Sequence, residues 1–339
     1  MKLEVYQRFL LLFLIVFGFQ ALFLAAQEPI ELPEGVPPES EWAYGQHLGQ
    51  VEDMMKVSDL AERVGKLETF MKKLHPKSKI LQYYESFFNR TVEDYQKAGQ
   101  TQEATALTKK MLQLFPNSAS LLTQELRTAI QAQNYAEAIE LGEKLQAIKP
   151  DQQTTILLAQ SYIATNNAAK ASEYSQKALQ ALGPKEGLYF AYWLATYHTD
   201  QRQIDKAVEY YDMVLKAYPQ GTPSGWNAGQ WNTIKATAYN TLARAAYDKE
   251  NYSGAIQNYG ESLRYSPQND LAYLSMGLSY WKLQQLEPAM DVFAKAVVLG
   301  KDHSATAREY LEQIYKPLNS DSLDGLDELL AKARTELNL

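Results

Sequence analysis

Apolar residues recur along most of the chain at intervals of three and four, which is the spacing of one face of an α-helix. Ala307, Leu311 and Ile314 show this spacing in one segment, and Leu326 and Leu330 show it in the next. No segment alternates apolar and polar residues clearly enough to indicate a strand. The pattern therefore predicts an all-α protein built from short amphipathic helices.

Residues 42–76 follow the same helical spacing and end at a proline. Their spaced apolar positions are Val57, Leu60, Val64, Leu67 and Met71. We expect this stretch to form an N-terminal helical unit that is less regular than those after it.

Prolines return along the middle of the chain at a nearly constant interval. They are Pro116, Pro150, Pro184, Pro219 and Pro267, and the successive intervals are 34, 34, 35 and 48 residues. The last interval is one period of 34 with 14 residues inserted. A fixed period of this size predicts a repeat architecture, in which each unit is stable only when it is stacked on its neighbours.

Two further positions recur upstream of the prolines. A small residue is found at Ala104, Ala138, Ala171, Ala207, Ala255 and Ala289. Four residues later stand Thr108, Gly142, Ser175, Tyr211, Tyr259 and Phe293. Small residues let helix backbones approach closely, and we expect the large side chains to fill the groove between one unit and the next. Proline then ends the second helix, because it cannot continue the hydrogen-bond ladder.

A small residue also stands twelve positions before the alanine, at Ala195, Ala243 and Gly277. Together these positions resemble the tetratricopeptide repeat, whose pattern is W-x2-L-G-x2-Y, then A-x3-F, then P over about 34 residues. The best match runs from Tyr273 to Lys301, followed by 236–269 and 188–221. The copies at 85–118, 119–151 and 152–187 keep the alanine and proline but lack the aromatic residue.

The resemblance implies a right-handed α-solenoid of helix-turn-helix repeats over residues 42–339. The sixth clear copy covers 270–303, and 304–339 would supply C-terminal capping helices. In this family the first helices line a concave groove that holds an extended peptide or a partner helix.

Eleven residues fall on the groove-facing places of the first helices, as the resemblance implies. They are Tyr189, Tyr192, Thr196, Asp200, Asn240, Arg244, Tyr247, Asp248, Leu274, Trp281 and Lys282. Aromatic side chains beside hydrogen-bonding groups are typical of adaptable recognition surfaces. The competing interpretation is that some of these aromatic rings only cover neighbouring helices.

Some members of the family bind a C-terminal carboxylate with a clamp of Lys, Asn and Arg. Asn240 and Arg244 occupy suitable places for such a clamp. Tyr192 and Thr196 stand where the adjacent unit would need its lysine and asparagine, so we do not expect a carboxylate clamp here.

The inserted residues lie in the segment QGTPSGWNAGQWNTI, which carries Trp226 and Trp231. One interpretation is a loop over the groove that offers both indoles to a ligand. The other is a longer first helix that begins near Asn227, with both indoles packed on the stack. The sequence favours the second interpretation only slightly.

Composition and charge narrow the function classes. The chain has 339 residues, 46% hydrophobic and 22% charged, with a net charge of −7 and no cysteine. A negative balance argues against non-specific binding of nucleic acid, and the absence of cysteine excludes thiolate catalysis, disulfides and Cys-ligated zinc. The 23 tyrosines fit repeat and groove positions such as Tyr211 and Tyr247.

The N-terminus carries an export signal pattern. Lys2 and Arg8 precede an almost wholly apolar run, Phe9 to Ala26, which predicts a cleaved signal peptide or an uncleaved membrane anchor over 1–26. Four prolines then mark residues 27–41 as a linker. We expect an exported protein that is periplasmic, secreted or held at the inner membrane by residues 9–26.

No catalytic set, metal site or cofactor motif is found. The four histidines (His47, His75, His198 and His303) lie too far apart for metal ligation, and we expect them at surface or capping positions. Residues 320–331 only faintly resemble a calcium loop, because serine and alanine stand where the first and last ligands should be. We therefore expect no enzyme activity and no cofactor.

The function predicted is a non-catalytic scaffold in the cell envelope that binds a peptide or protein through the concave groove. The alternative is an envelope-anchored structural or assembly subunit that works by self-association. A hydrolase or ligand-binding enzyme hidden in the repeats is the least favoured interpretation. The sequence does not identify the partner.

Overall fold

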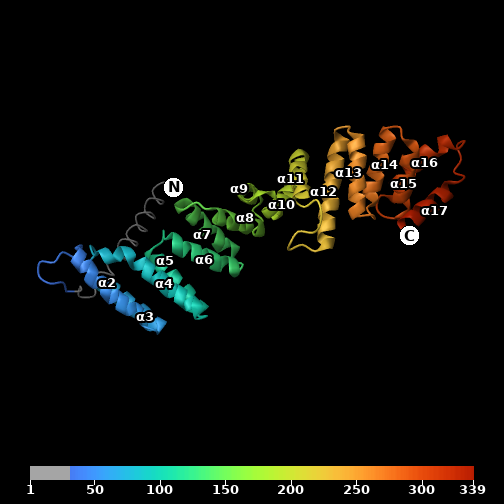
Figure 1. Cartoon of the computed structure of the whole chain (residues 1–339). Helices are drawn as coiled ribbons and strands as arrows, with labels where there is room; N and C mark the ends of the chain where they lie inside the picture. The colour runs from blue at the N-terminus through green and yellow to red at the C-terminus, as the bar shows by residue number, and fades with distance from the viewer. Residues whose placement is uncertain (1–30) are drawn as a thin grey trace, which may run out of the picture. The chain divides into compact units, whose positions relative to one another are not determined.

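The computed structural model describes residues 31–339, and within this range every regular element is a helix. Sixteen α-helices and one short 3₁₀ helix follow one another (Figure 1). Their bounds are α2 (Glu41–Met55), α3 (Leu60–Lys73), η1 (Lys79–Tyr83), α4 (Tyr84–Lys97), α5 (Thr101–Leu114), α6 (Ala119–Gln131), α7 (Tyr135–Ile148), α8 (Gln152–Ala164), α9 (Ala168–Glu186), α10 (Leu188–Asp200), α11 (Ile204–Ala217), α12 (Ala228–Asp248), α13 (Tyr252–Tyr265), α14 (Asp270–Lys282), α15 (Leu286–Val298), α16 (Ser304–Leu318) and α17 (Leu326–Leu337). The predicted all-α fold is confirmed.

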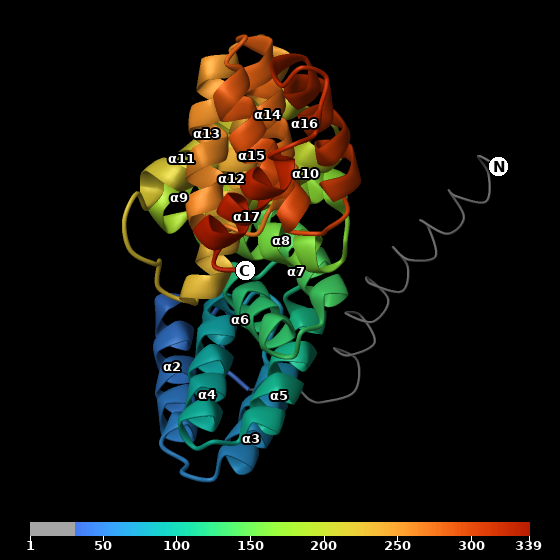
Figure 2. The ribbon, with the colours of Figure 1, turned by 90° about the vertical axis from the view of Figure 1, so that its right-hand side faces the viewer.

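The helices form pairs joined by short turns, and each of the six predicted repeats contains one pair. The contacts divide the chain into two compact units, one ending at Ser161 and one beginning at Tyr162, with the boundary inside α8. In the second unit α14, α15, α16 and α17 pack side by side, and α17 covers α15 (Figures 1 and 2). The right-handed course of a solenoid and the limits of the domains stay predictions.

The recurring positions of the sequence are the core of these pairs. All six repeated alanines are buried, and so are all six residues four positions later. Phe293 lies in a core cluster with Ala289 and Leu311, which shows that the cluster joins successive pairs. The expected groove-filling role is only part of its packing, since Phe293 also contacts Gly277 in its own pair.

The turn inside each of the six repeats uses one left-handed residue, two positions before the second helix. These residues are Gly99, Gln133, Asn166, Arg202, Glu250 and Gln284, with φ between 55° and 74°. A left-handed residue reverses the chain within a few positions, and only Gly adopts it without steric cost. The asparagines that follow three of them, Asn134, Asn167 and Asn251, cap the next helix through their side chains.

One sequence expectation about helix ends needs correction. The spacing that included Val57 crosses a break, because α2 ends at Met55 and Asp59 caps α3. Val57 instead accepts two hydrogen bonds from the Arg63 guanidinium, at 3.0 and 2.8 Å. Pro184 stands directly after a break in α9, because Gly183 leaves the helical conformation with φ 75° and ψ 169° and only a short helical stretch follows to Glu186.

The N-terminal predictions fall mostly outside the described residues. The signal or anchor at 1–26 and the first part of the 27–41 linker precede residue 31. Residues 31–40 contain no helix, and two turns in them are closed by bonds from Val36 N to Pro33 O and from Ser40 N to Pro37 O, each 3.0 Å. Within residues 31–339, no helix has the length and apolar content needed to cross a bilayer.

Candidate functional site

The predicted binding residues lie on α10, α12 and α14, the first helices of three pairs in the second unit. The second helices support them from behind. Tyr211 of α11 and Tyr259 of α13 are 2% and 5% exposed and belong to the core clusters on which α10 and α14 pack. Burial raises the pKa of both tyrosines.

On α10, the predicted residues differ in how much surface they offer. Tyr189 is 45% exposed and lies edge-on to Phe190, with ring centroids 5.5 Å apart. Tyr192 is half-buried and meets Trp226 edge-on at 5.8 Å. Thr196 is also half-buried and donates its hydroxyl hydrogen to the Tyr192 carbonyl at 3.1 Å. Tyr189 is thus the ring on this helix most available to a partner.

On α12, Asn240 and Arg244 stand one turn apart and so share a face. The Asn240 side-chain oxygen is buried and has no hydrogen-bond partner among residues 31–339. Arg244 is exposed, and its Nε lies 3.9 Å from the Asp248 carboxylate, a loose contact that leaves the guanidinium largely free for another acceptor. Tyr247 is half-buried and packs edge-on against Tyr252 at 5.3 Å.

On α14, Trp281 is half-buried and meets Tyr310 of the next pair edge-on at 5.5 Å. Lys282 is exposed and enters no ion pair within residues 31–339. Leu274 is only 6% exposed and belongs to the core cluster of the second unit, so it offers no surface to a partner. The groove position assigned to Leu274 is therefore wrong, because the preceding and following helices cover it.

The two interpretations of the inserted segment are now distinguished. Asn227 caps α12 through a capping box with Gln230, so the helix begins eight residues before the repeat boundary predicted at 236. Trp231 is 1% exposed. Trp226 is half-buried, and its ring centroid lies 6.2 Å from that of Trp231. The interpretation as a longer first helix is confirmed.

The histidine expectation is wrong for two of the four residues. His47 is 2% exposed and shares a 2.9 Å hydrogen bond between its Nδ1 and the Ser78 hydroxyl. His198 is 3% exposed, and its Nδ1 lies 2.7 Å from the Gln203 side-chain oxygen. Both fill core space between helices, a role that their wide spacing in the sequence could not reveal. Within residues 31–339, no group of acidic and histidine side chains could hold a metal ion.

Sequence reasoning missed a run of stacked rings that joins α10 to α11. Trp193 stacks on Tyr197 at 5.3 Å, Tyr197 meets His198 at 5.1 Å, and His198 stacks on Tyr210 at 5.4 Å. The signal was present in the aromatic pair at positions 193 and 197, four residues apart on one helix face. These rings join α10, which carries Tyr189 and Tyr192, to α11.

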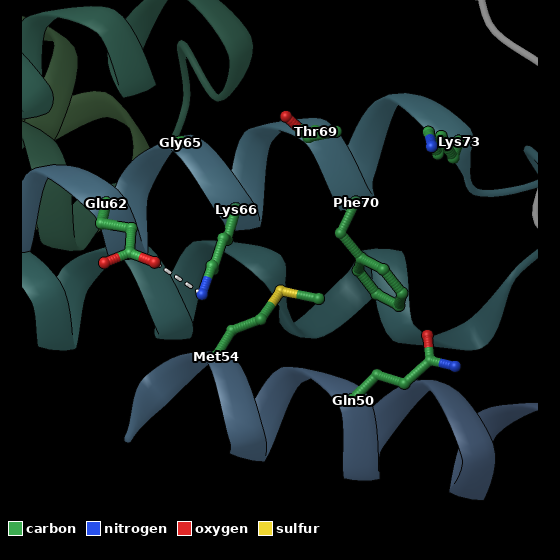
Figure 3. A pocket seen from close by; sticks show the side chains of 8 residues that line it. All are labelled: Gln50, Met54, Glu62, Gly65, Lys66, Thr69, Phe70 and Lys73. Carbon is green, nitrogen blue, oxygen red and sulfur yellow. Dashed lines mark ion pairs between the residues drawn. The ribbon is translucent and has the colours of Figure 1, made fainter. Parts of the chain in front are cut away.

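An open cleft of about 620 Å³ lies between α2 and α3 in the first unit, and sequence reasoning did not predict it (Figure 3). Met54 from α2 and Phe70 from α3 face each other across it, and Lys66 at its edge pairs with Glu62 at 2.7 Å. The period offered no signal for this cleft, because the first pair precedes the clear repeats.

The tetratricopeptide-repeat family matches the chain in three places. A TPR repeat matches residues 243–284, and a tetratricopeptide repeat matches residues 156–222 and again residues 271–299. The matches cover residues 156–222 and 243–299, and they show tetratricopeptide repeats in this part of the chain. No curated protein matches the chain.

Several solved structures are similar at low identity. YrrB, described as a TPR protein with an unusual peptide-binding site, is 16% identical, covers 60% of this chain and 97% of its own, and gives a TM-score of 0.42. MamA is 18% identical over 55% of this chain and 94% of its own, with a TM-score of 0.38. Yeast Tom70 is 16% identical over 87% of this chain and 62% of its own, with a TM-score of 0.37. Similarity at this level carries no argument about a ligand.

Proposed function

We propose that this tetratricopeptide-repeat protein is a non-catalytic scaffold that binds an extended peptide or a partner segment on α10, α12 and α14. The observation that carries the proposal is the Asn240 side-chain oxygen, which is buried and unpartnered one turn from the exposed Arg244. An unpaired buried acceptor is costly, and a peptide N–H would satisfy it. Arg244 could then bind a carbonyl or carboxylate of the same ligand.

The remaining residues of this face suit such a ligand. Tyr189 offers an exposed ring, and Lys282 offers an ammonium without an ion-pair partner among the described residues. Rings of this kind supply contact area at a low cost in side-chain entropy. The mixed charges of Arg244, Asp248 and Lys282 favour a polar peptide backbone over a strongly charged partner.

The test uses substitutions that leave the core intact. A phage-displayed library of short random peptides is selected on the wild-type protein, and bound peptides are measured by fluorescence anisotropy. Asn240→Leu with Arg244→Ala should weaken the selected peptides about ten-fold or more. The matched control is Arg264→Ala, an exposed arginine on the second helix α13. Equal binding to the double variant and to the wild type would show that the surface is wrongly assigned.

We propose also that the protein is exported, on the basis of the apolar run Phe9–Ala26. Intact mass of the protein purified from its native cells tests this. A mass lacking residues 1–26 supports cleavage and secretion, and a full-length mass in the membrane fraction supports an anchor. A full-length protein in the soluble fraction would contradict both.

The alternative is a structural subunit that works by self-association. Sedimentation at several protein concentrations distinguishes it from the peptide-binding scaffold. A monomer at every concentration disfavours it and leaves the binding proposal unchanged. Concentration-dependent dimers that survive the Asn240 and Arg244 substitutions would favour it.

A further inference from the structure

The outer face of α3 is exposed beside the open cleft of the first unit. Its exposed residues form a line along the helix that we call the α3 stripe: Glu62, Gly65, Lys66, Thr69 and Lys73. Met54 of α2 and Phe70 of α3 form the apolar part of the cleft next to this stripe (Figure 3). The surface therefore combines charged groups at its edge with an apolar floor.

The charges of the α3 stripe are free to change partners. Glu62 pairs with Lys66 one turn along the same helix at 2.7 Å, and both side chains are about half exposed (55% and 49%). An exposed pair of this kind contributes little to stability, so either group can accept another partner. Lys73, at the other end of the stripe, is exposed and enters no ion pair within residues 31–339.

Gly65 leaves open space in the middle of the α3 stripe. A Cβ at this position would meet nothing within 4 Å, whereas the helix glycines Gly142 and Gly277 each face a large side chain from another helix at 2.7 and 2.5 Å. Gly260 of α13 also faces open space, so an open glycine does not by itself mark a contact. Beside the cleft, however, Gly65 allows a second helix to approach the backbone of α3 closely.

The α3 stripe is complementary to itself when two copies of α3 lie antiparallel. Glu62 and Lys73 stand equally far from the midpoint of the stripe, which falls between Leu67 and Glu68. A two-fold contact centred there places Glu62 opposite Lys73 of the second copy, and Lys73 opposite Glu62 of the second copy.

The inner positions match in the same register. Gly65 falls opposite Phe70 of the second copy, a small residue against a large one, and Lys66 falls opposite Thr69. No like charges stand directly opposite each other in this arrangement. An acidic helix from another protein would meet the Glu62 carboxylate as well as the lysines, so the charges favour a second copy of this chain.

We propose that the protein forms a two-fold symmetric dimer in which the α3 stripes of two copies pack antiparallel. Two Glu62–Lys73 ion pairs close the ends of this contact. The four-carbon stems of Lys66 and Lys73 from each copy cover the apolar floor of the other cleft at Met54 and Phe70. The contact lies in the first unit and does not depend on the peptide surface of α10, α12 and α14.

Charge reversal tests the register directly. The protein is expressed in its native cells and purified in the form that those cells keep, and its association is measured by sedimentation velocity. Lys73→Glu and Glu62→Lys should each weaken the dimer about ten-fold or more, because each places like charges opposite each other at both ends. An equimolar mixture of the two variants should associate again, since every facing pair in the mixed dimer has opposite charges.

A second variant tests the close approach at Gly65. Gly65→Gln adds a side chain in the open space of the monomer and should weaken the dimer about ten-fold or more, because it holds the second helix away. Gln also favours a helix more than Gly does, so this variant should fold. Gly260→Gln is the matched control and should leave the association unchanged. Circular dichroism and peptide binding check that every variant keeps its fold.

Three results would overturn the proposal. The first is a wild-type monomer at every concentration up to about 0.1 mM. The second is a dimer that Lys73→Glu or Gly65→Gln leaves unchanged, which would assign the association to another surface, such as residues 9–26. The third is a mixture of the two charge variants that does not associate, which would exclude the antiparallel register. Peptide binding measured on the same samples reports separately on the proposed function.

Discussion

The repeats at 119–151 and 270–303 each pack one large side chain against a glycine on a neighbouring helix. They differ in which helix carries the glycine and which helix carries the large side chain. In the later repeat the first helix has Gly277, and Phe293 from the second helix packs onto it so closely that a Cβ at 277 would lie 2.5 Å from the ring. In the earlier repeat the second helix has Gly142. Leu158 from the first helix of the following pair packs there, 2.7 Å from where a Cβ would stand.

The comparison shows how a repeat can lose its aromatic residue and still pack. The interface needs one small and one large partner, and either helix can supply the large one. The repeat at 270–303 completes this contact within its own pair, whereas the repeat at 119–151 depends on the next pair. We therefore expect the unfolding of the repeat at 119–151 to be coupled more strongly to that of the following pair.

The largest loss of stability should come from truncating the large side chains that pack against the two glycines. Phe293→Ala should destabilise the protein by about 3–5 kcal/mol and Leu158→Ala by about 2–5 kcal/mol, through lost burial and the cavity left behind. Hydrogen exchange should place the first loss in α14 and α15 and, through the ring of Tyr310, in α16, and the second in both α7 and α8. A loss confined to α8 in the second variant would contradict the dependence of one pair on the next.

Replacing either glycine by alanine should change the free energy of unfolding less, and the two changes should differ. Gly277→Ala meets the fully buried Phe293 ring, and we expect a loss of about 1–3 kcal/mol from overpacking. Gly142→Ala meets the branched end of the buried Leu158 side chain, which can turn more easily than a ring, and the gain in helix propensity of about 1 kcal/mol should offset the shift. Urea unfolding of both variants measures the difference, and equal losses would contradict it.

An acidic residue at the start of a repeat should make the later region sensitive to acid. Asp270 accepts hydrogen bonds at 2.8 Å from the His303 backbone N–H and at 3.2 Å from its ring, and thereby ties the start of α14 to the start of α16. Burial raises the pKa of Asp270, but the His303 bonds outweigh it and hold the pKa below its usual range. In the earlier region Asp151 has a lowered pKa too, but it caps only its own helix through Thr154.

The direction in which stability changes with pH follows from the lowered pKa of Asp270. Its contribution is present above the unfolded-state pKa of about 3.9 and is lost as the pH falls through the folded-state pKa. Asp270→Asn should cost about 1 kcal/mol at pH 7 and flatten the loss of stability in acid. Stability measured at pH 7 and at the lowest pH where the protein stays folded tests this. An acid dependence as steep as that of the wild type would rule out this role.

The smallest effect concerns the caps of the second helices. Asn134, Asn167 and Asn251 cap their helices, whereas Gln100, Gln203 and Gln285 stand at the same place without a side-chain bond to the first turn of the helix. Gln285→Asn should stabilise the protein by about 0.5–1 kcal/mol, because the shorter amide reaches the N–H of the first turn. Asn251→Gln is the matched reverse change, and thermal unfolding should move in opposite directions for the two.

The candidate surface was predictable only in part. The period placed Tyr189, Asn240 and Arg244 on first helices, and their side chains are exposed or contain an unpartnered buried atom. It also placed Leu274 there, although neighbouring helices bury it. Register along one helix assigns a face, but burial depends on the residues that the adjacent helices bring against that face.

Local physics explains what the sequence by itself determined about this protein. Proline ends, left-handed turns, small residues and the three-to-four spacing all act within one or two turns of helix, so the 34-residue period predicted the helix pairs. Contacts between residues far apart in the chain were decided only by the tertiary structure. They include the filling of Gly142 by Leu158 and the burial of His47 and Trp231. Each depends on which side chain a neighbouring helix supplies, and a repeating pattern leaves that choice open.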